Sequence, residues 1–179
     1  MTTLFSDRSI WTMVHGIVLG GAALMGLAAA LFSLYAVRAS PRPPGATPHE
    51  SRALAWLTVS TAVMLWLTVL VGTYVIFPPY RAAPAEGMLD LSQFPRSLLL
   101  AKPDTAWLHA FAMESKEHMP WIAAMLGTAV AFVSVRYRST MLDDVRLKSM
   151  AATLLAVCFA LVAFVALLGV FVNKVAPLQ

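Results

Sequence analysis

The stretch MAATLLAVCFALVAFVALLGVFV, residues 150–172, contains no charged side chain and decides the fold of this chain. A helix of about 20 apolar residues is long enough to cross a hydrocarbon core of about 30 Å. Charged residues lie on either side of the run, with Lys148 before it and Lys174 after it. We therefore expect a membrane-spanning helix here, in which Cys158 is a small packed side chain.

The composition of the whole chain supports this assignment. Of 179 residues, 59% are hydrophobic and 12% are charged, whereas a soluble domain has roughly a quarter of its residues charged. The net charge of +4 is small, so we expect the lipid bilayer and no nucleic acid as a partner. Zinc-protease, phosphate-loop and nucleophile-elbow motifs are absent, which is more typical of a non-catalytic or electron-transfer subunit than of a stand-alone enzyme.

Three more apolar runs complete the predicted topology. They cover about 10–37, 52–77 and 120–135, and an interfacial segment at 82–119 joins the second span to the third. We expect Pro78 and Pro79 to end the second span, and Pro120 to kink or to begin the third. The predicted fold is all-α, a single membrane domain (1–179) that forms a four-helix bundle with a long extramembrane loop between helices 2 and 3.

The distribution of basic residues indicates an orientation. Seven of the 13 Lys and Arg residues lie in or beside the short connectors between spans one and two and between spans three and four. The other six are spread over longer segments on the opposite side. Because cytoplasmic loops are enriched in Lys and Arg, we expect both termini and the 82–119 segment to lie outside, in the periplasm of a bacterial inner membrane.

His15 is an ionisable side chain inside the first span, which makes it a candidate functional residue. It has three interpretations: a neutral imidazole bonded to a neighbouring helix, an axial ligand of a haem iron, or a group that handles protons or a quinone. Gly16 and Gly20 form a GxxxG pair beside it. Such a pair allows close approach of a helix, or leaves room for a flat ring.

A second candidate region is the stretch WLHAFAMESKEHMPW, residues 107–121. Its His118 is expected near the outer end of span three, at a depth similar to that of His15. Two histidines on different helices at one depth can bind a b-type haem from opposite faces of the porphyrin. Tyr74 and Arg81 would then lie near the propionates. His109 is an alternative ligand, although it lies nine residues before His118 and so on the opposite face of a straight helix.

The same stretch allows a different interpretation. Glu114, Lys116, Glu117 and His118 form either a solvated polar face or a proton-relay and quinol-headgroup site. Glu114 and His118 are four residues apart, so their side chains can pair on one helix face.

The placement of His15 and His118, with Tyr74 and Arg81 nearby, resembles that of small four-helix membrane b-type cytochromes. The resemblance implies that haem b is held between helices near one membrane face. It also implies electron transfer between a quinol and an outside acceptor, as one subunit of a larger membrane complex. The competing hypothesis is a cofactor-free accessory or assembly subunit that docks other membrane subunits through the 82–119 segment.

Overall fold

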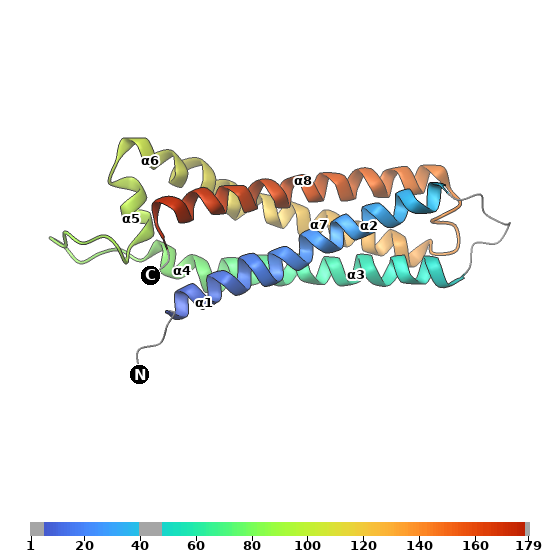
Figure 1. Ribbon diagram of the computed structural model, residues 1–179, viewed down its shortest axis with the longest axis horizontal. Coiled ribbons are helices and arrows are strands. Elements are labelled where there is room, and N and C mark those ends of the chain that lie inside the picture. Colours follow the sequence, from blue (N-terminus) through green and yellow to red (C-terminus); the bar gives the residue numbers. More distant parts are fainter. Residues whose placement is uncertain (1–5, 40–47, 178–179) are drawn as a thin grey trace.

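The computed structural model describes residues 6–39 and 48–177, which form a bundle of long helices (Figure 1). The predicted proline-rich connector falls at 40–47, outside the described residues. The first long helix joins α1 (Asp7–Met13), the π-helix η1 (Val14–Gly20) and α2 (Gly21–Ala39). The second joins α3 (Pro48–Val71), the π-helix η2 (Gly72–Ile76) and α4 (Phe77–Arg81).

The third long helix joins α6 (Pro103–Trp107), the π-helix η3 (Leu108–Met113) and α7 (Glu114–Arg136). The fourth is α8 (Val145–Val175), and a short helix, α5 (Pro95–Leu100), lies in the loop before α6.

Four segments of the described chain are long and apolar enough to cross a membrane, and they are Asp7–Tyr35, His49–Arg81, Pro103–Arg136 and Val145–Val175. They confirm a multi-pass membrane protein with an all-helical four-helix bundle, and the described residues include no strand. The start of α1, the end of α8 and the α4–α6 connection all lie at one end of the bundle, here called the loop end (Figure 1).

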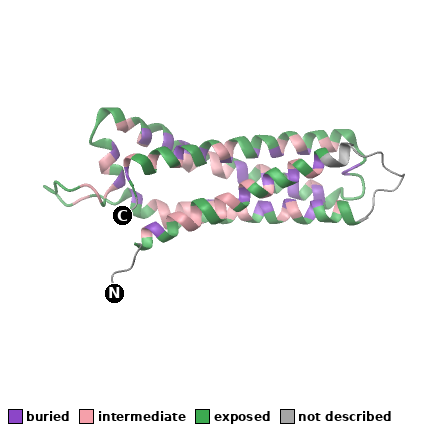
Figure 2. Ribbon diagram, in the orientation of Figure 1, coloured by how far each residue is buried: buried purple, intermediate pink, exposed green. Residues whose placement is uncertain are grey.

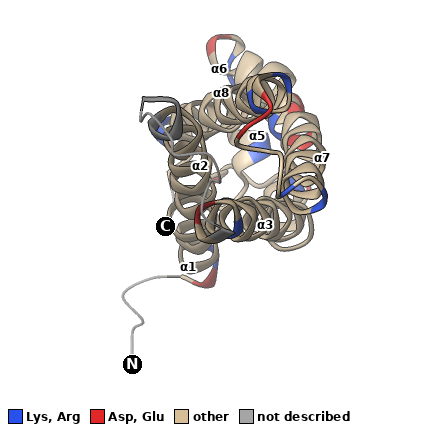
Figure 3. Cartoon of the chain, turned by 90° about the vertical axis from the view of Figure 1, so that its right-hand side faces the viewer, with Lys and Arg blue, Asp and Glu red and all other residues tan. Residues whose placement is uncertain are grey.

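The long helices pack in a closed ring. α2 packs against α3, α3 against α7, α7 against α8, and α8 against α2, so that the helices occupy the corners of a square when seen end-on (Figure 3). The core is apolar, with Leu27, Val130 and Leu155 almost completely buried. The indole N–H of Trp66 donates a hydrogen bond of 2.9 Å to the Thr128 hydroxyl, which joins α3 to α7.

The third helix begins earlier than the sequence predicts. It starts at Pro103 and continues through Pro120, which lies inside α7. The predicted 82–119 segment therefore has two parts. Up to residue 102 it is a connection that contains the short helix α5, and from Pro103 it is the projecting start of a membrane helix. Similarly, the second helix continues past Pro78 and Pro79 to Arg81. Pro78 and Pro79 lie at the first positions of α4, directly after the π-helix η2, where the α-helical hydrogen-bond pattern is already interrupted.

A second, smaller apolar cluster lies at the loop end and is here called the cap. Its buried residues are Tyr80, Leu99, Leu108, Ala112, Met113 and Leu168. Between the cap and the main core, most residues of the helices are partly buried or exposed (Figure 2). The candidate site lies in this intermediate zone.

Candidate functional site

His15 lies in η1 and packs against the second helix where α3 changes to η2. A Cβ added to Gly72 would lie 2.8 Å from the imidazole Cε1, so only a glycine leaves room for the ring here. The imidazole also interacts with the backbone of Thr68. Its Nδ1 is buried and has no hydrogen-bond partner among the described residues. This nitrogen is therefore available to a ligand or a proton.

Lys116 points into the bundle from the third helix. It lies seven residues before Ala123 and 14 before Val130, which are 0% and 1% exposed. Because seven residues make almost two helical turns, all three share one face. Its ammonium nitrogen faces α8, where a Cβ added to Gly169 would lie 2.7 Å away. Lys116 also interacts electrostatically with His15.

No carboxylate or hydrogen-bond acceptor pairs with Lys116 in the described part of the chain. A lysine at the centre of a membrane-spanning helix costs about 2.5–3.5 kcal/mol on insertion scales, and a lysine near a helix end usually extends its ammonium toward water. Lys116, which is partly buried, instead directs its ammonium toward Gly169 of α8. The inward direction of this ammonium makes Lys116 a candidate functional residue.

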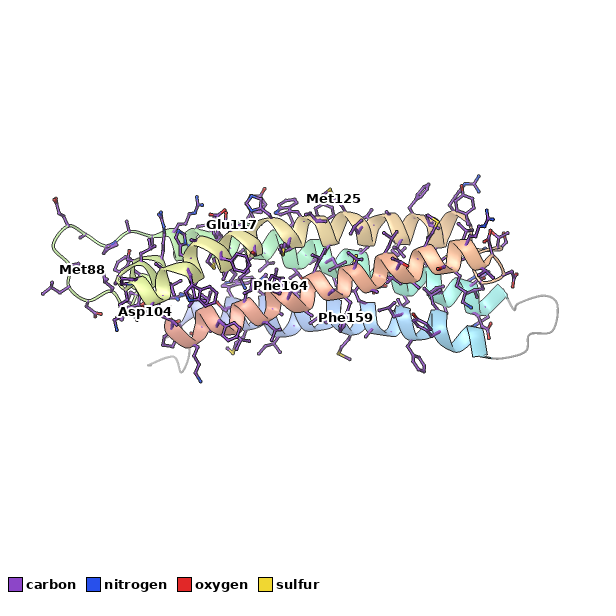
Figure 4. The ribbon with its side chains drawn as sticks, turned by 90° about the horizontal axis from the view of Figure 1, so that it is seen from above. Met88, Asp104, Glu117, Met125, Phe159 and Phe164 are labelled. Atoms are coloured by element: carbon purple, nitrogen blue, oxygen red, sulfur yellow. The ribbon has the colours of Figure 1, made fainter. Side chains whose placement is uncertain are left out.

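Glu117 lies on α7, toward the loop end of the bundle (Figure 4). Its Oε2 is 3.6 Å from Nη2 of Arg81, which is 54% exposed. Its Oε1 is buried and has no hydrogen-bond partner among the described residues. The guanidinium of Arg81 also stacks on the Phe77 ring at 4.5 Å from the centroid. We call His15, Lys116 and Glu117 the polar layer.

The depth of the polar layer follows from the helix lengths. Lys116 and His15 each lie about 20 residues from the far ends of their spans, at Arg136 and Tyr35. At about 1.5 Å per residue this is about 30 Å, the thickness of the hydrocarbon core. The polar layer is therefore close to the membrane boundary at the loop end, beneath the cap.

The cap contains a polar contact of its own. The Tyr80 hydroxyl and Nδ1 of His109 are 2.8 Å apart and form a hydrogen bond between α4 and η3. Tyr80 also interacts electrostatically with Arg96 of α5 and with Glu117. His109, which the sequence analysis gives as an alternative haem ligand, therefore holds two parts of the cap together.

Three of the four long helices contain a π-helical segment, and all three segments lie toward the loop end. His15 is in η1, Gly72 begins η2, and His109 is in η3. A π-turn has one more residue than an α-turn. It therefore shifts the directions in which all later side chains point around the helix axis. Such segments are frequent at functional sites, and here they flank the polar layer.

The structure does not bring His118 to His15. His118 is exposed, and its Nδ1 hydrogen-bonds the Glu114 carbonyl oxygen of its own helix at 2.8 Å. It lies seven residues before Met125 and 14 before Phe132, which are 56% and 65% exposed. These three residues form an outward stripe on α7. The expected pairing of the Glu114 and His118 side chains is also replaced by this bond to the backbone.

The predicted haem site was therefore tested against this geometry. A haem between His15 and His118 needs both imidazoles on opposite faces of one porphyrin. His15 faces the interior, whereas His118 lies on the outward stripe, so the pair does not fit one haem within this chain. The described residues also contain no group of three or more metal-ligating side chains.

The remaining predicted residues have other positions. Tyr74 is 68% exposed, and Arg81 pairs with Glu117. A Cβ on Gly16 would meet nothing within 4 Å, and on Gly20 it would meet only the His15 carbonyl, at 3.3 Å. Gly16 and Gly20 therefore do not make a close contact with a neighbouring helix. Helices meet closely at other glycines, with Gly26 against Thr61 and Gly127 against Leu65.

Comparisons with known proteins give no family assignment, since no protein-family model, curated protein sequence or solved structure matches the chain. Sequence reasoning located His15, Arg81 and the 107–121 stretch. It did not identify Lys116 as the inward residue, nor the glycines that face His15 and Lys116. The seven-residue spacing from Lys116 to Ala123 and Val130 was the signal that could have found it.

Proposed function

We propose that the polar layer binds the head group of a quinone-class hydrogen carrier and exchanges protons with it. The observation that carries this proposal is the unpaired ammonium of Lys116 inside the bundle, close to His15. A quinone is soluble in the bilayer and has carbonyl oxygens that accept hydrogen bonds. Its reduced form has hydroxyl groups that donate them.

The polar layer contains both kinds of partner. Lys116 has three N–H donors, and the buried Nδ1 of His15 can donate or accept, depending on its tautomer. Glu117 has a buried acceptor, Oε1. Apolar surroundings with a few convergent polar groups are typical of small-molecule sites. The depth near the membrane boundary also suits a head group whose tail extends into the bilayer.

A route from the bilayer is consistent with the helix arrangement. η1 packs mainly against α3 and much less against α8. A lipid-soluble molecule would approach His15 between η1 and α8. On the far side of the polar layer lies the apolar core, which contains few titratable groups. The site therefore serves protons on one side of the membrane, which by the charge bias is the outside of a bacterial inner membrane.

Other membrane subunits remain part of this proposal. Leu89 is 97% exposed and lies beside Met88 near the tip of the loop between α4 and α5 (Figure 4). An exposed apolar tip outside the membrane supports docking to a partner, so we propose that the chain is one subunit of a membrane redox complex.

Photocrosslinking tests the quinone site. A photoreactive short-chain benzoquinone would be added to the purified protein, and the labelled peptides would be identified by mass spectrometry. We expect labels in η1 and α7 that an excess of ordinary quinone removes. Lys116→Met should weaken binding about 10–100-fold, as expected for the loss of a charged hydrogen bond worth about 1.5–3 kcal/mol.

Lys174→Met is the matched control, because Lys174 is exposed at the end of α8. It should bind the probe as the wild type does. Equal labelling of wild type and Lys116→Met would contradict the proposal. A reduced-minus-oxidised visible spectrum of the same sample tests the haem hypothesis separately: an α band that His15→Ala abolishes would support haem on His15, with its second ligand outside this chain.

A further inference from the structure

We infer that Glu117 carries protons between the other two residues of the polar layer, His15 and Lys116, and the water at the loop end, and that Arg81 pairs with its charged form at that boundary. The inference rests on the proposed function only for the identity of the molecule whose protons Glu117 would carry. Proton exchange by Glu117 itself requires no quinone.

The two oxygens of Glu117 have different surroundings. Oε2 is 3.6 Å from Arg81, whose side chain is 54% exposed, whereas the Glu117 side chain is 22% exposed. Oε1 is buried and has no hydrogen-bond partner in the described part of the chain. One carboxylate therefore has one oxygen beside a solvated cation and the other oxygen shielded from solvent.

The positions of the two oxygens suit a proton carrier. Oε2 lies beside the exposed guanidinium of Arg81, so the carboxyl group is in contact with the solvated side. Oε1 is buried and has no partner in the described part of the chain, so it is free to accept a proton there.

The proposed step is a simple transfer. An N–H bond of Lys116 or of the His15 imidazole breaks, which leaves that donor deprotonated until it takes up another proton, and a new O–H bond forms on Oε1 of Glu117 while the ion pair with Arg81 is weakened. The O–H bond then breaks toward water at the loop end, and the carboxylate pairs with Arg81 again. No electrons move in either step, and Glu117 returns to its starting state.

Other charged or titratable groups also surround this boundary and contribute to its pH dependence. They are Tyr80 and Arg81 of α4, Arg96 of α5, His109 of η3, Glu114 and Lys116 of α7, and His15 of η1. Glu114 is exposed on the same helix, three residues before Glu117, and provides a matched control carboxylate.

Reaction with dicyclohexylcarbodiimide tests the inference on the full-length protein in lipid vesicles. This apolar reagent adds to a carboxyl group only when the group is protonated and within its reach. We expect an adduct on Glu117 whose rate of formation falls as the pH at the loop end rises. Glu117→Gln should remove the adduct, and Glu114→Gln should leave it unchanged.

Arg81→Gln provides a second variant that does not alter the carboxyl group. Without the cation the neutral form is favoured, so the rate of adduct formation at a given pH should rise several-fold. An absent adduct on Glu117, or a rate that follows the pH on the opposite side of the membrane, would overturn the inference. If Glu117 gave no adduct but the quinone probe still labelled the protein, the inference about Glu117 would fail and the proposed quinone site would stand. If Glu117 reacted as expected but the quinone probe did not label the protein, only the proposed quinone site would fail.

Discussion

The ammonium nitrogen of Lys116 faces Gly169 so closely that a Cβ on Gly169 would lie 2.7 Å from it. On the opposite side of the bundle, Gly72 leaves room for His15 in the same way, with 2.8 Å between a Cβ and the imidazole Cε1. The two polar side chains are therefore each accommodated by a glycine of another helix. Alanine substitutions at the two glycines should have different consequences.

Gly72→Ala should destabilise the protein. The imidazole has only two rotatable bonds and is enclosed by the helix, so the added methyl group forces the ring or the backbone to shift, at a cost of about 1–3 kcal/mol. Thermal unfolding of the purified protein in detergent measures the change. Gly169→Ala should cost less than about 1 kcal/mol, because the end of a lysine side chain moves easily, but it should weaken quinone binding.

Gly21→Ala is the control for both glycine variants, because a Cβ at Gly21 would meet nothing within 4 Å. Alanine is the better helix former by roughly 0.5–1 kcal/mol, so this variant should be as stable as the wild type or slightly more so. An equal loss of stability in all three variants would show that the two contacts have no special role.

Lys116→Met should raise the unfolding temperature. Methionine has a similar length and no charge, so it removes an unpaired buried ammonium whose burial costs about 1–3 kcal/mol or more. Stabilisation together with loss of binding is the pattern expected of a residue retained for function. Unfolding followed by circular dichroism measures the effect, and a lower unfolding temperature would mean that Lys116 has a structural partner.

Tyr80→Phe should destabilise the cap by about 1 kcal/mol. The substitution removes the 2.8 Å hydrogen bond to His109 and leaves a partly buried imidazole nitrogen without a partner. Tyr74→Phe is the control, because Tyr74 is 68% exposed and should show no effect. Amide hydrogen exchange in α4 and η3 would locate the change, and equal exchange in both variants would contradict the role of this bond.

The loop between α4 and α5 should loosen in acid. The Ser92 N–H donates a hydrogen bond of 3.0 Å to Oδ1 of Asp90, and this bond lowers the pKa of the Asp90 carboxyl. Since the folded pKa is below the unfolded value of about 3.9, the turn is fully supported above that pH and weakens as the pH falls below it. Exchange of the Ser92 amide measures this.

Asp90→Asn separates the charge from the hydrogen bond in this turn. The Asn side-chain oxygen can still accept the bond, but it does not titrate in this range. The Ser92 amide of this variant should therefore show no added loosening as the pH falls below about 3.9, the range in which the wild-type turn weakens. The same acid response in both proteins would mean that another group controls the loop.

The number and positions of the spans could be read from the sequence, because burial in lipid depends mainly on the local run of apolar residues. The uncharged stretch at 150–172 lies within α8, and His15 could be recognised from its position as an ionisable residue inside a span. The start of the third helix was left open, because Pro120 can either kink a continuous helix or begin a new one, and the structure has the continuous helix.

Only the tertiary structure decided which residue of the 116–118 stretch faces inward. Adjacent residues on a helix differ by about 100° in direction, and the π-helix η3 adds a further rotation just before this stretch. Packing of α7 between α3 and α8 then directs Lys116 inward, places Glu117 at the boundary and turns His118 outward. Local sequence therefore determined that this is a membrane bundle, whereas helix rotation, which depends on contacts between distant segments, decided the site.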